Sequence, residues 1–197
     1  MRKRKSKKLK TTISIHIVCE GESEYYYIQS LIKEYKLETP HISYYNLKGQ
    51  GYKNALTYFM KNACLYNIFI FILDLDRANE LKAEQLTLNR LINTIQKENK
   101  ANNVFLSNPN FETYVAACIG VNRKELEKHG YEKGNTIYNF IKSNQGNHVN
   151  SKQFLSGPYY LDKSDPNKII TSSEKNINIE QSSLVNFIEY LENLIKK

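Results

Sequence analysis

The run Ile68-Phe69-Ile70-Phe71-Ile72-Leu73 is the most apolar stretch of this chain and constrains its fold more than any other feature. It is short, rich in β-branched and aromatic residues, and ends at Asp74. Such a run, with no polar residue in alternation, is typical of a strand buried on both faces, as in a parallel sheet. The sequence therefore predicts that helices cover both faces of a sheet that contains this strand.

Strand and helix patterns alternate around this run. Alternating apolar residues predict a first strand over residues 13–19, a weaker strand over 41–47 and a short fourth strand over 104–106. Apolar residues at helical spacing separate the strands: Ile28, Leu31, Ile32 and Tyr35; Leu56, Phe59, Met60 and Ala63; Leu86, Leu88, Leu91, Ile92 and Ile95. Ser23 is expected to cap the first helix. The βαβαβαβ order predicts an α/β fold with a mostly parallel four-stranded sheet.

The second half of the chain reads mainly as helical. Helices are expected over residues 111–119, 123–129, 135–143 and 184–197, whereas residues 145–179 are rich in Asn, Ser, Lys and Gly and are expected to be loop-rich. A length of 197 residues suits one domain. We therefore expect a tail over residues 1–11 and a single domain over 12–197, with a core at 12–120 and a helical and loop-rich extension at 121–197.

The positive charge of the chain is concentrated at its start. The net charge is +8, but seven of the 28 basic residues lie within residues 1–10, which leaves 21 basic against 20 acidic residues elsewhere. The tail, which includes Arg2, Lys3, Arg4 and Lys5, either contacts nucleic acid phosphates or is a solubilising terminus. No secretory signal and no membrane-spanning apolar window is seen, and the three cysteines lie far apart. We expect a cytoplasmic protein without a membrane partner.

Acidic residues follow three of the predicted strands. Glu20 ends the first, Asp74 and Asp76 end the third, and Glu112 comes after the fourth. Because ligands bind beyond the carboxyl ends of strands in open α/β sheets, these four carboxylates are expected to converge at one edge. Asp74 and Asp76, two residues apart, are expected to point to the same side of a strand. Each of these acids could alternatively be a helix cap or turn former.

Carboxylates held close together repel one another, and a hard divalent cation relieves this repulsion. Such an ion stabilises charge on a phosphodiester. The expected cofactor is therefore Mg²⁺ or Mn²⁺ at a site that acts on phosphate. The four histidines show no ligand spacing, and His16, within the first strand, is expected to be a core residue with satisfied hydrogen bonds.

Three short blocks, in this order, resemble a known family. Residues 17–24 (IVCEGESE) look like the acidic turn of toprim domains, especially those of RloB-like proteins. Residues 72–76 (ILDLD) are similar to the DxD strand end of toprim domains, and residues 107–112 (SNPNFE) resemble a further RloB-type block. The sequence departs from the pattern where Arg77-Ala78 follows the DxD block, and where Thr113-Tyr114-Val115 replaces an aromatic-rich stretch.

The resemblance implies a Rossmann-like toprim core and Mg²⁺-dependent nuclease chemistry in bacterial anti-phage defence, as an effector of abortive infection. It implies that Glu20 is a general acid/base or lies near the metal, that Asp74 and Asp76 are metal ligands, and that Glu24 and Glu112 are auxiliary acids. It also implies nucleic acid as the substrate, either DNA or RNA such as tRNA, and a partner ATPase. Lys133 and Arg77 are candidates for nucleic-acid contact, with a solvated lysine and an Arg77–Glu80 pair as the alternatives.

Two other functions fit the same residues. A degenerate toprim fold would be a non-catalytic nucleic-acid-binding or regulatory subunit of an ATPase-containing defence complex, an alternative suggested by Arg77-Ala78 and by the nearly neutral body of the chain. Nucleotidyl transfer would require nucleotide-binding features that the sequence does not display.

Overall fold

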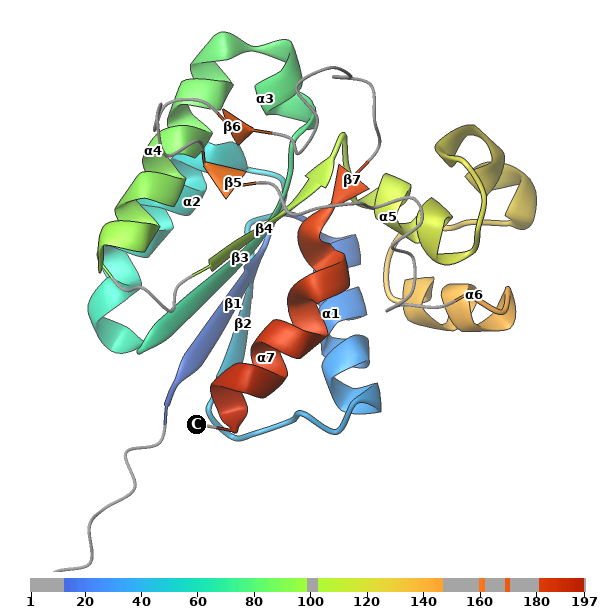
Figure 1. Ribbon diagram of the computed structural model, residues 1–197, viewed down its shortest axis with the longest axis horizontal. Helices are drawn as coiled ribbons and strands as arrows, with labels where there is room; N and C mark the ends of the chain where they lie inside the picture. The colour runs from blue at the N-terminus through green and yellow to red at the C-terminus, as the bar shows by residue number, and fades with distance from the viewer. Residues whose placement is uncertain (1–12, 99–102, 147–159, 162–168, 171–180, 197) are drawn as a thin grey trace, which may run out of the picture.

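The protein is an α/β structure in which helices cover both faces of a central sheet (Figure 1). The computed structural model describes residues 13–98, 103–146, 160–161, 169–170 and 181–196. The basic tail, including Arg2, Lys3, Arg4 and Lys5, and most of the segment 145–179 lie outside the described residues.

The sheet has five strands in the order β2-β1-β3-β4-β7. They are β1 (Ile15–Cys19), β2 (Ile42–Asn46), β3 (Ile68–Asp74), β4 (Asn103–Asn108) and β7 (Gln181–Ser182). The first four in this order are parallel, and β1 lies between its partners with Ile15 opposite both Ile42 and Ile68. The predicted α/β fold with a four-stranded parallel sheet is therefore confirmed. The short strand β7 adds an antiparallel edge beside β4, which the sequence did not indicate.

The helices follow the strands in the predicted order. They are α1 (Glu22–Glu34), α2 (Gly51–Asn62), α3 (Asp76–Glu80), α4 (Lys82–Glu98), α5 (Phe111–Cys118), α6 (Ile137–Ser143) and α7 (Phe187–Ile195). The described residues also form three 3₁₀ helices: η1 (Ala63–Leu65), η2 (Arg123–His129) and η4 (Ser183–Asn186). The helix expected over 123–129 is thus of the 3₁₀ type, and the expected C-terminal helix is divided into η4 and α7. The two-residue strands β5 (Tyr160–Leu161) and β6 (Ile169–Ile170) pair separately.

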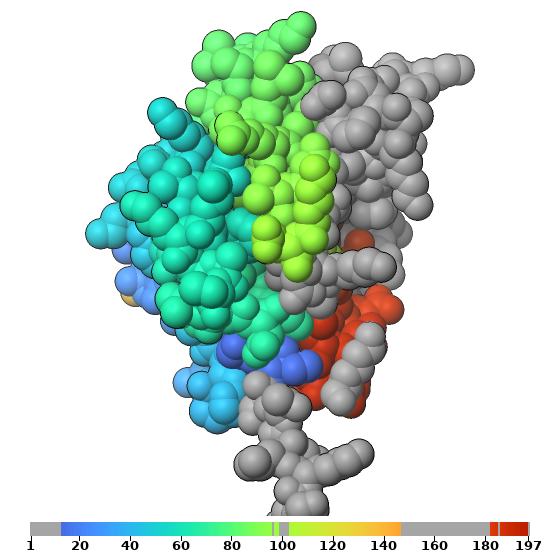
Figure 2. All heavy atoms as spheres, turned by 90° about the vertical axis from the view of Figure 1, so that its left-hand side faces the viewer, coloured from blue at the N-terminus to red at the C-terminus, as the bar shows by residue number. Residues whose placement is uncertain are grey.

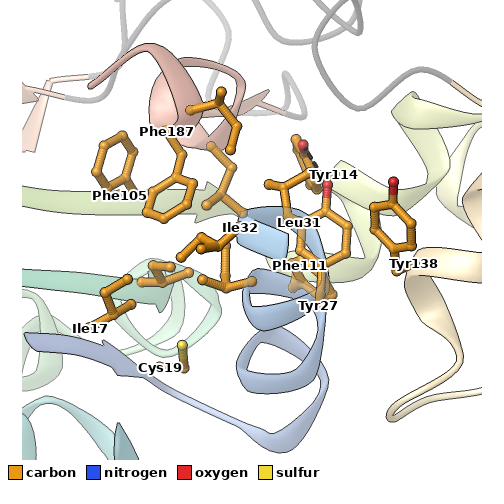
Figure 3. Packing of buried hydrophobic residues seen from close by; sticks show 14 of the residues in the cluster. Ile17, Cys19, Tyr27, Leu31, Ile32, Phe105, Phe111, Tyr114, Tyr138 and Phe187 are labelled. Atoms are coloured by element: carbon orange, nitrogen blue, oxygen red, sulfur yellow. Dashed lines mark hydrogen bonds between the residues drawn. The ribbon is translucent and has the colours of Figure 1, made fainter. Parts of the chain in front are cut away.

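Alternate residues of β3 serve two different cores, which explains why its apolar run has no polar interruption. Ile68, Ile70 and Ile72 belong to the cluster under α1, α5 and α7, whereas Phe69 and Phe71 belong to the cluster under α2 and α4. Figure 3 shows part of the first cluster, with Phe105 beside Phe187 and Tyr27 beside Tyr114. Figure 2 shows α2 and α4 packed side by side over the other face.

Two apolar residues of the helical patterns do not reach the core, and neither does Tyr35, the residue after α1, which is 37% exposed. Met60 is 64% exposed and Leu86 is 50% exposed. A helix buries only one stripe of its surface. In α2 that stripe is Tyr52, Ala55, Leu56 and Phe59; in α4 it is Leu88, Leu91, Ile92 and Ile95. Helical spacing identified the helices correctly but assigned these two side chains to the wrong face.

Candidate active site at the carboxyl edge of the sheet

The carboxyl ends of β1, β3 and β4 meet at one edge of the sheet, where six acidic residues line a cleft of about 400 Å³. These are Glu20, Glu22, Glu24, Asp74, Asp76 and Glu112. Glu20 directly follows β1, Asp74 ends β3, and Glu112 is the second residue of α5. The parallel sheet therefore brings together acids that are as many as 92 positions apart in the sequence.

Asp76 reaches the cleft by a different route from the one expected. Strand β3 ends at Asp74, Leu75 adopts a helical backbone, and Asp76 is the first residue of α3. The expectation that Asp74 and Asp76 share one side of a strand was wrong, because the chain turns into a helix between them. The main-chain N–H of Leu75 donates to the carbonyls of both Ser107 and Pro109, which holds this turn against the end of β4.

Glu20 is fixed by hydrogen bonds between β1 and β3. Its N–H donates to the carbonyl oxygen of Ile72 at 2.9 Å, and its side-chain Oε2 accepts from the N–H of Asp74, also at 2.9 Å. Its own carbonyl accepts from the N–H of Gly49 at 2.8 Å. The Glu20 side chain is buried, so these contacts hold a carboxylate beside Asp74 with little access to solvent.

The start of α1 brings Glu24 into the same cleft. A side chain at Gly21, the residue before the helix, would place its Cβ only 2.9 Å from Glu24 Oε2, so the absence of a side chain lets this carboxylate approach closely. The expected N-cap at Ser23 was wrong, since α1 begins at Glu22 with Gly21 as its cap, two residues earlier. The Ser23 hydroxyl instead accepts from the N–H of Gly134 at 3.2 Å and ties residues 131–134 to α1.

Burial and mutual repulsion make several of these acids hard to ionise. Burial, with the charges of Glu20 and Glu112 adding to it, raises the pKa of Glu24 to about 7. The pKa of Asp74 lies well above its usual value, because of burial and then the charges of Glu24, Glu20 and Glu112. Burial also raises the pKa of Glu20, although the Asp74 N–H partly offsets the effect. The cleft thus holds more negative groups than its own donors stabilise.

Two basic side chains stand beside Glu112. Lys133 Nζ lies 3.0 Å from Glu112 Oε1, and the lysine side chain is 75% exposed whereas that of Glu112 is 17% exposed. With the Asn110 amide oriented to satisfy its neighbours, its nitrogen donates to Glu112 Oε2 at 3.3 Å and its oxygen accepts from Arg123 at 3.1 Å. Sequence reasoning missed Arg123, because only the packing of η2 on α5 brings it to this place.

Arg77 has a local partner in the described structure. Its Nη2 donates to the carbonyl oxygen of Gly49 at 2.7 Å. Gly51 has a φ of +75°, a backbone conformation that favours glycine, and a Cβ there would lie 2.5 Å from Arg77 Nη1, so the guanidinium would have to shift. Arg77 thereby clamps the turn between β2 and α2. Its proposed contact with nucleic acid remains a prediction.

The chemistry of the donor set fits a hard divalent cation. All six acidic side chains offer oxygen atoms, and Mg²⁺ is usually held by one or two carboxylates together with waters and substrate phosphate. Among the described residues, no three or more His, Cys, Asp or Glu side chains stand arranged as a ready set of metal ligands. The cleft therefore supplies carboxylates for partial coordination rather than a closed cage.

Comparison with protein-family models, with curated proteins and with solved structures finds no match to this chain. Within the described residues, no helix has both the length and the apolar composition needed to cross a bilayer. The function must therefore be argued from the cleft itself.

Proposed function

We propose that this protein is a metal-dependent nuclease of the toprim type that cleaves phosphodiester bonds in nucleic acid. The observation that supports it most is the convergence of six acidic residues in one cleft, from α1, β3, α3, α5 and the residue that follows β1, where burial and repulsion raise the pKa of three of them. Strongly perturbed carboxyl groups that share a cleft are typical of functional sites, because folding alone gains nothing from such repulsion.

In this proposal Glu20, Asp74 and Asp76 hold Mg²⁺ or Mn²⁺. The bound ion would stabilise negative charge on the phosphate and activate a water molecule. Glu20, buried and held by the N–H of Asp74, is the general acid/base or lies next to the metal. Glu24 and Glu112 are auxiliary acids that complete the negative wall of the cleft.

The substrate in this proposal is DNA or RNA, tRNA included. Lys133 lines the cleft with an exposed ammonium group, which suits a contact to a substrate phosphate. The basic tail, with Arg2, Lys3, Arg4 and Lys5, would add affinity that falls steeply with salt. A cytoplasmic role in anti-phage defence beside a partner ATPase is the corresponding biological setting.

Cleavage of plasmid DNA, single-stranded DNA and tRNA tests the proposal, with Mg²⁺ or Mn²⁺ and with or without the ATPase. We expect metal-dependent products from the wild type and none from Asp74→Asn. Glu189→Gln removes an exposed carboxylate from α7 and is the matched control, with cleavage unchanged. No product under any condition, or equal activity in Asp74→Asn, would refute the proposal.

One observation favours a non-catalytic alternative, a nucleic-acid-binding or regulatory subunit of an ATPase-containing complex. Glu112 is already paired with Lys133, and the described acids form no ready set of metal ligands. Calorimetry with Mn²⁺ separates the two functions. Micromolar binding that disappears in Asp74→Asn and Asp76→Asn supports the nuclease, whereas nucleic-acid binding without any metal binding supports the alternative.

A further inference from the structure

The hydroxyl group of Tyr131 is buried but has no hydrogen-bond partner among the described residues. Its ring packs edge-on against Phe140, with the ring centroids 5.6 Å apart. Packing against Phe140 therefore accounts for the burial of the ring, but it does not account for the burial of the hydroxyl. A buried polar group without a partner reduces stability, so an unpaired hydroxyl at this position calls for a role outside the resting structure.

The surroundings of the hydroxyl identify a candidate partner. Burial raises the pKa of Tyr131, and so do the charges of Glu112, Glu24 and Asp74, in that order. The phenol therefore remains protonated and can donate a hydrogen bond. Among these acids Glu112 has the greatest electrostatic effect on the phenol, and Lys133, only two residues after Tyr131, contacts Glu112 at 3.0 Å.

The two oxygens of Glu112 are held differently. Oε2 faces the amide of Asn110, which belongs to the short segment between β4 and α5. Within the part of the chain that the structure describes, Oε1 is held only by Lys133, at 3.0 Å, and this lysine is mostly exposed on a long flexible side chain. Oε1 is thus the atom that loses its partner if Lys133 turns toward a substrate phosphate.

We propose that Tyr131 is a positioning residue whose hydroxyl donates to Glu112 Oε1 when Lys133 leaves Glu112 to bind a phosphate of the substrate. This inference rests on the proposed nuclease function. Without a replacement donor, the departure of Lys133 would leave a mostly buried carboxylate without its charged partner, which is costly. A hydrogen bond from a hydroxyl to a carboxylate is strong enough to compensate in part.

The backbone around Tyr131 suits this exchange. The N–H of Gly134 donates to the Ser23 hydroxyl and anchors the segment to α1, while the Tyr131 ring is anchored on Phe140. Lys133 lies between these two anchors, and its side chain extends into solvent. The lysine side chain can therefore move while Tyr131 stays beside the cleft.

A double-mutant cycle in thermal unfolding tests the proposal on the metal-free full chain. Tyr131→Phe alone is expected to leave the melting temperature unchanged or to raise it by up to about 3 °C, because no hydrogen bond is lost in the resting state. In the Lys133→Met background, where Tyr131 can already reach Glu112, the same substitution is expected to lower the melting temperature by about 4 °C or more.

Lys133→Arg is the conservative control, because it keeps a cation beside Glu112; in this background Tyr131→Phe should again cause no loss. Tyr66→Phe, a tyrosine in the cavity at the opposite edge of the sheet, should show no coupling to Lys133. An equal effect of Tyr131→Phe in the wild-type and Lys133→Met backgrounds would overturn the proposal, since a purely structural hydroxyl acts independently of Lys133.

The cycle is distinct from the test of the proposed function, because it uses neither metal nor nucleic acid. A wild-type protein that neither cleaves nor binds Mn²⁺ refutes the nuclease, whereas additive unfolding refutes the role of Tyr131. In an active wild type, Tyr131→Phe should lower kcat about tenfold with KM nearly unchanged, because Lys133 still binds the phosphate. An unchanged kcat would also overturn the inference.

Discussion

The two ends of β1 each bury a polar side chain, but they treat it in opposite ways. Near the amino end, His16 Nδ1 lies 2.7 Å from Ser43 Oγ, and Nε2 lies 2.7 Å from the Tyr58 hydroxyl. The imidazole also stacks on Tyr66, with centroids 4.1 Å apart. At the other end, Glu20 joins a group of acids that repel one another. The two residues are only four positions apart in the sequence.

This contrast shows how a structural polar group differs from a candidate functional one. His16 has a partner for each ring nitrogen, so its burial is fully compensated, as the sequence reading of a satisfied core histidine expected. The acids at the carboxyl edge have too few donors, and Tyr131 beside them has a hydroxyl with no partner among the described residues. Uncompensated burial costs stability, and it is tolerated where binding or catalysis depends on it.

Among the substitutions that test this contrast, the largest expected effect is that of Asp74→Asn on catalysis. Asp74→Asn should lower metal-dependent cleavage by about 1,000-fold, since loss of a metal ligand removes several kcal/mol of transition-state stabilisation. The same variant should unfold at an equal or higher temperature without metal, because it removes one of the repelling carboxylates. Cleavage assays and thermal unfolding measure the two effects. A large loss of stability would show that Asp74 stabilises the fold, as His16 does, and would contradict the contrast.

At the amino end of β1 we expect the reverse: a large effect on stability and little effect on cleavage. His16→Ala should lower the free energy of unfolding by about 3 kcal/mol, because it leaves Ser43 and Tyr58 without their partner and opens a cavity. Cleavage per folded molecule should remain within about twofold of the wild type, since His16 lies away from the cleft. Urea unfolding measures the change. His41→Ala, at an exposed histidine, is the control and should change stability by less than about 0.5 kcal/mol.

The pH dependence of stability sharpens the contrast further. The folded-state pKa of Glu24 is raised to about 7, so its contribution to stability is present below about pH 4.5 and is lost as the pH rises to 7. Burial lowers the pKa of His16 to about 4, so its contribution is present above about pH 6.5 and is lost as the pH falls to 4. As the pH rises, the stabilising contribution of Glu24 is therefore lost while that of His16 is gained.

Glu24→Gln should isolate one of these opposing contributions. The free energy of unfolding of this variant, relative to the wild type, should increase by about 2–3 kcal/mol between pH 4.5 and pH 7.5 in metal-free buffer. Urea unfolding over this pH range measures the difference. A difference that does not change with pH would show that Glu24 is ionised without penalty, and the cleft would then resemble the satisfied histidine site.

The smallest expected effect concerns the close approach of Gly21 and Glu24. Gly21→Ala should lower stability by about 1 kcal/mol or less, because the new methyl group meets only the end of a flexible side chain. It should nevertheless weaken Mn²⁺ binding measurably in calorimetry, since Glu24 is pushed from its place. In the Glu24→Ala background the added methyl meets no carboxylate, so a further loss of Mn²⁺ affinity there would argue against this explanation.

The sequence was most informative where one local property decides the structure. The unbroken apolar run of β3 predicted its burial on both faces, and the order of strands and helices predicted which strand ends share an edge. Those two facts were sufficient to expect Glu20, Asp74, Asp76 and Glu112 in one region. Glu24 was named from the resemblance, and its position in the cleft depends on the bare backbone of Gly21.

The surroundings of Glu112 were predicted only in part. Lys133, one of many lysines, was named from the sequence as a candidate for nucleic-acid contact, whereas Arg123 and Tyr131 were not named as site residues. They reach the acids because η2 packs on α5 and because Gly134 bonds to Ser23, more than 100 positions earlier in the chain. Contacts of this kind depend on how whole elements pack, and a local sequence pattern does not predict them.

Taken by itself, the sequence determined the four parallel strands, their order along the chain and the edge at which the acids gather, because hydrophobic periodicity and the handedness of parallel crossovers leave few alternatives. Only the tertiary structure decided which acids are buried, which have donors, that Arg77 clamps a turn, and that one tyrosine hydroxyl stands without a partner in the described chain. The physical reason is that ionisation and hydrogen bonding depend on atoms a few ångströms away, whichever part of the sequence supplies them.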